Sequence, residues 1–312
     1  MNPLEYIAYF LVFPGFLFSS VMGLLALWVD RKVTARVQWR MGPPWYQNFV
    51  DVIKLLLYKE TLIPKGVSKV TFLGMPLLAA TSTTLVSTII LMINGDPHKG
   101  FIGDMIVVVY LLMIPAVALM LGGFTSANSL ASLGASREMK LMLSYELPFI
   151  LSLVVPIIKS GYCIRLGDII MHQASGGIII GSVSGALAFI VMLLCIQAKL
   201  GLAPFDIPEA ETEIISGPYI EYSGKALAIF KLSKAIATFI VPVFLITLFF
   251  GGIGSGIKNI VNAAGQYLLI LVLTILIKNT NPRVRIDQAV RFFWRPVTAV
   301  AVLSVVLAYL GY

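Results

Sequence analysis

Acidic side chains are concentrated in one segment of a chain that has few of them. Residues 201–224 hold five of the fifteen Asp and Glu residues, which are Asp206, Glu209, Glu211, Glu213 and Glu221. If residues 209–213 form a helix, Glu209 and Glu213 lie on one face, where two carboxylates raise each other's proton affinity. Such coupled carboxylates suit a proton relay, because each group must gain and lose a proton without a large free-energy step.

The same spacing has a structural interpretation. Asp206 stands three residues before Glu209, as a helix cap would, and Pro208 suits the first turn of a helix. Acidic residues also stabilise the N-terminus of a helix. Spacing alone therefore leaves both helix capping and proton handling open for this segment.

Glu146 is a second candidate because its neighbours are apolar. It precedes Leu147, Pro148 and the apolar residues 149–151, and on a helix it lies about 9 Å along the axis from Lys140. A charged group inside a membrane costs about 2.5–3.5 kcal/mol on insertion scales, so it faces protein or water and marks a functional site by default. The alternative is a neutral glutamic acid that joins two helices by a hydrogen bond.

Basic residues gather between residues 31 and 59. Lys32, Arg36 and Arg40 form a cationic stripe if this segment is helical. After a Gly-Pro-Pro break, apolar residues recur every three to four positions in residues 50–57, which predicts an amphipathic helix on the membrane surface. Anchoring to anionic lipid headgroups would explain the same pattern without a further function.

Long apolar segments must position all of these residues. The chain is 58% hydrophobic and 12% charged, with a mean hydropathy of +0.92, and a membrane-spanning helix needs about 20 mostly apolar residues. Backbone polar groups find no water in hydrocarbon, so helices rather than strands carry such segments. The sequence predicts an all-α, polytopic membrane protein with one membrane domain, residues 1–312, and about eight spans, near 4–28, 71–94, 105–123, 140–158, 178–198, 235–250, 258–277 and 296–312.

The distribution of basic residues predicts the orientation. Most of the 23 Lys and Arg residues lie in or beside the loops near 29–70, 124–139, 199–234 and 278–295, and basic residues are retained on the cytoplasmic side. We therefore expect these loops in the cytoplasm, both termini outside, and a multi-pass protein of the plasma membrane. Arg283 and Arg285 either anchor the last loop or pair with acids of the earlier loops. The net charge of +8 follows from the same bias, so no nucleic-acid partner is expected.

Composition limits the chemistry of the chain itself. Its two cysteines and two histidines cannot build a Cys₄ iron–sulfur site or a Cys/His zinc site. We therefore expect no catalytic metal and no cofactor on this chain, and whether it counts as an enzyme stays open. There is no internal repeat of the kind common in secondary transporters. The first apolar segment lacks the features of a signal peptide and is expected to remain as the first span.

Five charged motifs occur in order along the chain. They are Asp30-Arg31-Lys32 with Gln38, Arg40, Gly42-Pro43, Asp51 and Lys54; residues 123–146 ending in Ser144-Tyr145-Glu146; residues 203–211; Glu221-Tyr222-Ser223-Gly224; and Arg283, Arg285 and Asp287-Gln288. Together they resemble the NADH dehydrogenase subunit 1 family of respiratory complex I, the H-type subunit of bacterial NADH–quinone oxidoreductase, and its relatives in membrane-bound hydrogenases. The resemblance covers nearly the whole chain.

The resemblance implies a heel subunit at the junction of a peripheral redox arm and a membrane arm. Its acids would line a path toward antiporter-like subunits, with Glu146, Asp206, Glu209, Glu211, Glu213 and Glu221 as candidates. Candidates for the redox-arm interface or for charge pairing are Asp30, Arg31, Arg36, Arg40, Asp51, Lys54, Arg283, Arg285 and Asp287. Electron transfer in the arm would shift protonation or loop position here. Moving one charge against 100 mV takes about 2.3 kcal/mol, so a pKa shift of about two units at each step supplies enough free energy to move the ion.

Departures from the quinone-linked pattern indicate the branch of the family. Leu202 stands where those members usually have Arg, Asp30 replaces their Glu, and residues 217–235 resemble the hydrogenase branch. This implies a ferredoxin-linked complex that translocates H⁺ or Na⁺, either a membrane-bound [NiFe] hydrogenase or a sulfane (polysulfide) reductase. Its iron–sulfur clusters, and the NiFe centre of a hydrogenase, would lie on partner subunits, with ferredoxin as indirect donor and lipid around the chain.

Three alternatives remain beside this interpretation. The first keeps the fold but restores quinone as the electron acceptor. The second is a free-standing ion transporter or channel that uses the same acids. The third is a passive anchor for the redox arm. The sequence decides neither the acceptor, nor the ion, nor whether this chain conducts it.

Overall fold

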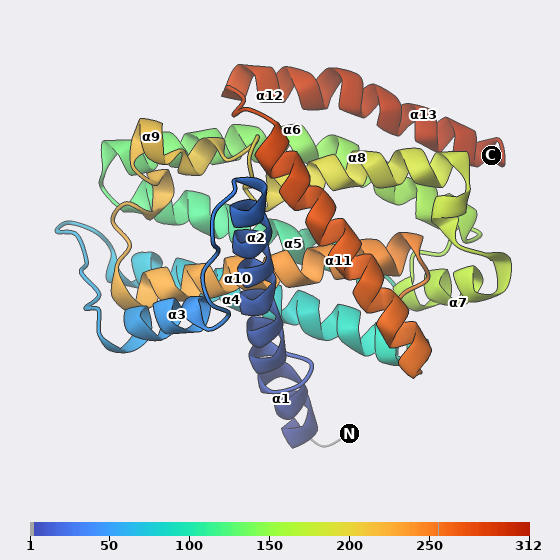
Figure 1. Ribbon diagram of the computed structural model, residues 1–312, viewed down its shortest axis with the longest axis horizontal. Coiled ribbons are helices and arrows are strands. Elements are labelled where there is room, and N and C mark those ends of the chain that lie inside the picture. The colour runs from blue at the N-terminus through green and yellow to red at the C-terminus, as the bar shows by residue number, and fades with distance from the viewer. Residues whose placement is uncertain (1–2, 255) are drawn as a thin grey trace.

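The protein is a bundle of helices, and the residues that the structure describes, 3–254 and 256–312, contain no strand (Figure 1). This computed structural model confirms the predicted all-α, polytopic membrane fold. Side chains are described from residue 7 onward, apart from residues 211 and 255. Among the described residues, seven helices are long and apolar enough to cross a membrane: Ile7–Val37, Lys69–Gly95, Asp104–Thr125, Ser129–Lys159, Gly224–Phe249, Ile257–Thr280 and Ile286–Tyr309.

The eighth expected span, residues 178–198, is a shorter helix. It is α8, Val183–Lys199, with 17 residues, or about 25 Å at 1.5 Å per residue. The hydrocarbon core of a bilayer is about 30 Å thick, so α8 approaches the length needed to cross it.

The first span is interrupted. Helix α1 covers Pro3–Leu11 and helix α2 covers Phe16–Val37. Residues 12–15 between them contain Pro14, which cannot donate a backbone hydrogen bond to a continuing helix.

Several helices continue well beyond the apolar segments that predicted them. Helix α2 ends at Val37 instead of near residue 28, α6 (Ser129–Lys159) begins eleven residues before residue 140, and α10 (Gly224–Phe249) begins eleven residues before residue 235. Charged residues that hydropathy assigns to loops therefore stand on rigid helices. This difference matters for the site, because the added turns of α6 and α10 carry two of its charged side chains, Glu138 and Lys234.

Helix α10 is the centre of the bundle. It packs against α2, α4 (Lys69–Gly95), α11 (Ile257–Thr280) and α3 (Gln47–Leu57), and Figure 1 shows it running through the middle of the molecule. Gly23 permits its contact with α2, since a Cβ atom there would lie 2.3 Å from the carbonyl oxygen of Ala235. Small residues that let helix backbones approach closely are typical of membrane bundles.

The predicted amphipathic helix is present as α3. Its buried side, with Asn48 and Val52, faces Leu24 of α2 and Leu232 of α10. The apolar side, which was predicted from residues 50, 53 and 57, is exposed: Ile53, for example, is 48% exposed. Such a face suits contact with lipid at the membrane surface.

The remaining elements complete the bundle and connect its helices. They are η1 (Pro97–Lys99), α5 (Asp104–Thr125), α7 (Leu166–Gly176), η2 (Ile179–Gly181), η3 (Ile207–Glu209), α9 (Glu211–Ile214), η4 (Gly217–Tyr219), α12 (Ile286–Phe292), the π-helical turn η5 (Phe293–Val297) and α13 (Thr298–Tyr309). Helices α3 and α9 lie toward one end of the molecule, and α7 lies toward the opposite end (Figure 1).

Candidate functional site: a buried cluster of carboxylates and lysines

The acidic segment folds as three short turns instead of one helix. Glu209 ends η3, Ala210 breaks the helical path with φ −53° and ψ 97°, and Glu213 belongs to α9. The prediction that Glu209 and Glu213 share one helix face is therefore wrong. Asp206 occupies the N-cap position of η3 and Pro208 lies in its first turn, as the capping interpretation predicted, but the Asp206 side chain makes no capping hydrogen bond.

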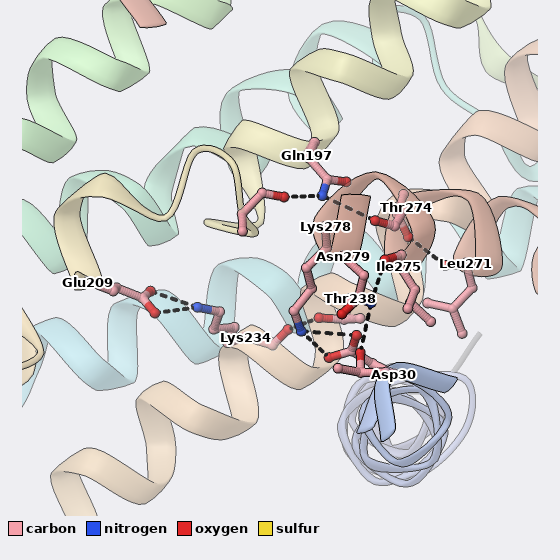
Figure 2. Close-up of polar contacts among 12 residues, drawn as sticks. Asp30, Gln197, Glu209, Lys234, Thr238, Leu271, Thr274, Ile275, Lys278 and Asn279 are labelled. Carbon is pink, nitrogen blue, oxygen red and sulfur yellow. Dashed lines mark hydrogen bonds and ion pairs between the residues drawn. The ribbon is translucent and has the colours of Figure 1, made fainter. Parts of the chain in front are cut away.

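Contacts with distant helices fix this segment. The side chain of Gln197, on α8, donates to the carbonyl oxygens of Ala203 (2.7 Å) and Thr274 (3.2 Å) (Figure 2). The backbone N–H of Val284 donates to the carbonyl oxygen of Pro204 (3.1 Å). The turn η4 lies against α5 and α6, because Gly134 leaves room for Pro218; a Cβ there would be 2.6 Å from the proline ring.

Glu209 forms an ion pair with Lys234, a residue of α10. The Lys234 Nζ atom lies 2.7 Å from Oε1 and 2.6 Å from Oε2 (Figure 2). Both side chains are largely buried, at 26% and 30% exposed. Gly201, which has φ +59°, brings the chain after α8 close to the pair: a Cβ there would lie 3.4 Å from the carboxylate and 3.6 Å from the ammonium.

This ion pair separates two cavities. The larger, of about 520 Å³, is lined by α2, α3, α10 and the segment after α9, and includes the pair of Arg31 with Asp51. The smaller, of about 70 Å³, lies between α4, α5, α6, α8 and α10. Four residues line both cavities and form the partition between them: Glu209, Tyr219, Phe230 and Lys234.

The smaller cavity has several polar and charged groups in a largely apolar wall. Its walls include the side chains of Glu138 and Lys199, and the hydroxyl oxygens of Thr83 and Ser233 lie 3.5 Å apart there. A buried water needs at least about 10–15 Å³ and two to four polar partners. The smaller cavity can therefore hold several waters that connect its charged groups.

Lys199 links the smaller cavity to Glu146. The Lys199 Nζ atom lies 3.6 Å from Glu146 Oε2, and the two side chains are 5% and 12% exposed. The ammonium also lies 4.3 Å from the ring centre of Phe149, a distance at which a cation is attracted to the ring face. Glu146 is thus buried inside the protein, as its apolar neighbours predicted.

Glu138 is the residue that sequence reasoning missed. It lies on α6, is 8% exposed and lines the smaller cavity with Lys199 and Lys234. Hydropathy placed residue 138 in a loop, because the apolar part of α6 begins later. The available signal was its position within the charged motif of residues 123–146.

The central group of the site consists of Glu138, Glu146, Glu209, Lys199 and Lys234, and with all five side chains ionised it has a net charge of −1. Glu138, Glu146 and Glu209 contribute three carboxylates, whereas Lys199 and Lys234 contribute two ammonium groups. Lys199 is next to Glu146 and Lys234 is bound by Glu209, so Glu138 is the carboxyl group without an ion pair of its own among the described residues. An unbalanced charge in a low-dielectric site is costly. The central group therefore has a capacity for one additional proton or monovalent cation.

Tyr219 supplies a hydroxyl group at the partition. Burial raises the pKa of Tyr219 well above its usual value, and the neighbouring carboxylates of Glu209 and Glu138 raise it further. The phenol therefore stays protonated at physiological pH and can donate a hydrogen bond to water or to a carboxylate.

The other predicted path residues lie apart from the central group. Asp206 pairs with Arg283 (2.9 Å) and Glu221 accepts a hydrogen bond from Asn128 (2.6 Å). Glu213, which is 59% exposed, pairs with Arg137 at 2.6 Å. The side chain of Glu211 lies outside the described residues.

The predicted interface residues divide into paired and exposed groups. Asp30 pairs with Lys278 of α11 at 2.8 Å, beside a hydrogen bond from Asn279 to Thr34 (Figure 2). Arg31 pairs with Asp51 at 3.2 Å. Five others are exposed: Arg36, Arg40, Lys54, Arg285 and Asp287. Within residues 3–254 and 256–312, no three His, Cys, Asp or Glu side chains are grouped as metal ligands would be.

Comparison with known proteins identifies the family. A family model described as "NADH dehydrogenase" matches residues 9–309. The chain belongs to the NADH dehydrogenase family. Among its relatives, the H-type subunit of NADH-quinone oxidoreductase from Thermomicrobium roseum is 34% identical, covering 93% of this chain and 92% of the relative. The same subunit from Anoxybacillus flavithermus is 31% identical, covering 91% and 86%.

A solved structure extends the comparison within the NADH dehydrogenase family. A chain of the membrane-bound sulfane sulfur reductase, described as an archaeal respiratory membrane complex, matches with a TM-score of 0.85 and 27% identity, covering 94% of this chain and 96% of that one. The resemblance inferred from the charged motifs is confirmed at the level of the family.

Proposed function

We propose that this chain is the heel membrane subunit of a complex I-like oxidoreductase that couples electron transfer in a peripheral arm to ion translocation. Family membership and the match to a subunit of a respiratory complex support the setting. The observation that carries the coupling role is the buried group of three carboxylates and two lysines around the smaller cavity.

The proposed path begins at the larger cavity and crosses the partition. A proton or cation that reaches Glu209 competes with Lys234 for the carboxylate. Waters of the smaller cavity then connect the partition to Glu138 and to Lys199. Because Lys199 is next to Glu146, a change of charge at Glu138 alters the electrostatic potential at Glu146. Charge movement is thereby passed along the membrane plane.

The partner subunits follow from this role. The exposed charges at the α3 and α9 end form the surface for a peripheral arm with iron–sulfur clusters, and that end faces the cytoplasm because basic residues gather there. Antiporter-like membrane subunits receive the charge movement. The pairs and hydrogen bonds of Asp206, Glu213 and Glu221 hold the loops there. Together with Glu211, these residues are candidates for extending the path toward the arm.

We propose a ferredoxin-linked complex, either a sulfane reductase or a membrane-bound hydrogenase. The fold of the sulfane reductase subunit and the presence of Leu202 support this branch. The test is purification of the whole complex through a tag on this chain, with metal analysis and parallel assays of ferredoxin-dependent hydrogen and sulfide production. Nickel with hydrogen assigns the hydrogenase, and sulfide without nickel assigns the reductase. Absence of any iron–sulfur partner contradicts the proposal and favours a free-standing transporter.

A quinone-reducing complex is the second candidate. The cavity of about 520 Å³ falls in the usual range for small-molecule sites, about 300–1,000 Å³, and the curated relatives are named for quinone reduction. Stoichiometric quinone extracted from the same purified complex, with quinone-dependent oxidation of the donor, would support this candidate over the first.

The coupling role is tested with Glu146→Gln and Glu209→Gln. Each variant leaves a lysine without its carboxylate partner, so metal content is measured first to establish assembly. The assembled complexes should translocate fewer ions per electron in proteoliposomes. Glu60→Gln is the matched control, because Glu60 is exposed and lines neither cavity. Unchanged ion-to-electron ratios in both variants would support a passive anchor instead.

A further inference from the structure

A third cavity lies at the opposite end of the bundle from the larger cavity of the site. Its volume is about 650 Å³, and its walls come from α1, α2, α4, α10, α11 and the loop after α10. The aromatic rings of Phe18, Phe239 and Tyr267 follow one another along it, with centroids 6.1 Å and 5.7 Å apart. The rest of the wall is mostly apolar and includes Tyr9 and Phe13, whereas its polar groups, among them Asp96 and Lys99, lie near residues 94–99.

The cavity opens between weakly packed helices. Helix α11 packs against α2 and α10, whereas α1 packs against α2 and α4. Phe13 and Ile260, which line the cavity from opposite sides, are 60% and 54% exposed. In a membrane the opening therefore faces hydrocarbon.

Two polar features distinguish this cavity from a simple gap. Lys99, which is exposed, lines the cavity and belongs to a stretch where the chain has few basic residues. The hydroxyl oxygen of Tyr267 is buried and has no hydrogen-bond partner within the described part of the chain. A buried hydroxyl without a partner is costly, so an occupant with an oxygen acceptor would stabilise the folded protein.

We propose that this cavity binds one phosphate-bearing membrane lipid. Its hydrocarbon chain lies along Phe18 and Phe239, an oxygen between chain and headgroup accepts a hydrogen bond from the Tyr267 hydroxyl, and its phosphate lies beside the Lys99 ammonium. A helix about 10 Å across would fill this volume with only about one and a half turns, so a membrane-spanning helix of a partner subunit does not fit. An alkyl chain fits without displacing either wall.

The first test compares two neighbouring substitutions on α11 in the purified complex. Ala264→Trp places an indole in the cavity, because Ala264 lines it. Gly265→Trp is the matched control: Gly265 does not line the cavity, and a Cβ there meets nothing within 4 Å. Native mass spectrometry should find one tightly bound phospholipid fewer per complex in Ala264→Trp than in Gly265→Trp. Equal lipid counts would overturn the proposal.

The second test does not depend on filling the cavity. A benzophenone amino acid at position 264 is irradiated in the intact complex within native membranes. The expected product is this chain with the added mass of one phospholipid, and Lys99→Gln should lower its yield several-fold. Crosslinking to a partner polypeptide, or a lipid yield equal to that from position 265, would overturn the proposal.

Discussion

Removing the Lys199 side chain should strongly destabilise the protein. Lys199 Nζ lies 3.6 Å from Glu146 Oε2, and the side chains are 5% and 12% exposed. At this distance the pair attracts by about 4–5 kcal/mol with an effective dielectric constant near 20. Lys199→Met leaves the Glu146 carboxylate without its cation, and breaking one partner of a buried pair typically costs about 3–5 kcal/mol.

The double variant separates loss of the ion pair from loss of packing. Replacing both partners by uncharged residues of similar size is often close to neutral, so Lys199→Met with Glu146→Gln should recover most of the lost stability. The assay is thermal unfolding of the purified complex, followed through this chain. We expect a midpoint lowered on the order of 10 °C in the single variant and largely restored in the double variant. Equal loss in the single and double variants would refute the ion-pair argument.

Two further variants test the peripheral pairs. Arg137→Gln breaks the pair with Glu213, which is 59% exposed. Exposed pairs contribute about 0–1 kcal/mol, so thermal unfolding and ion transport should change little. Lost transport would place Glu213 in the path. Lys278→Met leaves Asp30, whose side chain is 13% exposed, without its cation and should cost about 3 kcal/mol in thermal unfolding. The added substitution Asp30→Asn should restore stability, whereas additive losses would contradict a direct α2–α11 ion pair.

The sequence predicted the fold well because a membrane restricts the choices. Apolar segments of about 20 residues in hydrocarbon can only be helices, so α4, α5 and α11 follow from hydropathy. Glu146 was also found this way, since a charged residue among apolar neighbours is conspicuous. The amphipathic helix α3 was found from its periodicity, although its buried side is the one with Asn48 and Val52.

The site was harder to predict because two of its charges lie on helical turns that precede the apolar segments. Glu138 is the tenth residue of α6 and Lys234 is the eleventh residue of α10, and hydropathy assigned both to loops. The break at Ala210 depends on tertiary contacts of the segment with α8 and with Val284, and residue spacing does not contain that information. Pairs between distant helices, such as Lys199 with Glu146, likewise require the three-dimensional arrangement.

The most direct test of the account is the ion-to-electron ratio of a Glu138→Gln complex in proteoliposomes, beside Glu60→Gln. Glu138→Gln removes the third carboxylate of the central group and with it the capacity for an additional proton or cation. The account predicts an assembled complex with normal metal content whose ratio of translocated ions to transferred electrons falls severalfold, while Glu60→Gln keeps the original ratio. An unchanged ratio in Glu138→Gln would contradict the proposal that this buried group couples electron transfer to ion movement.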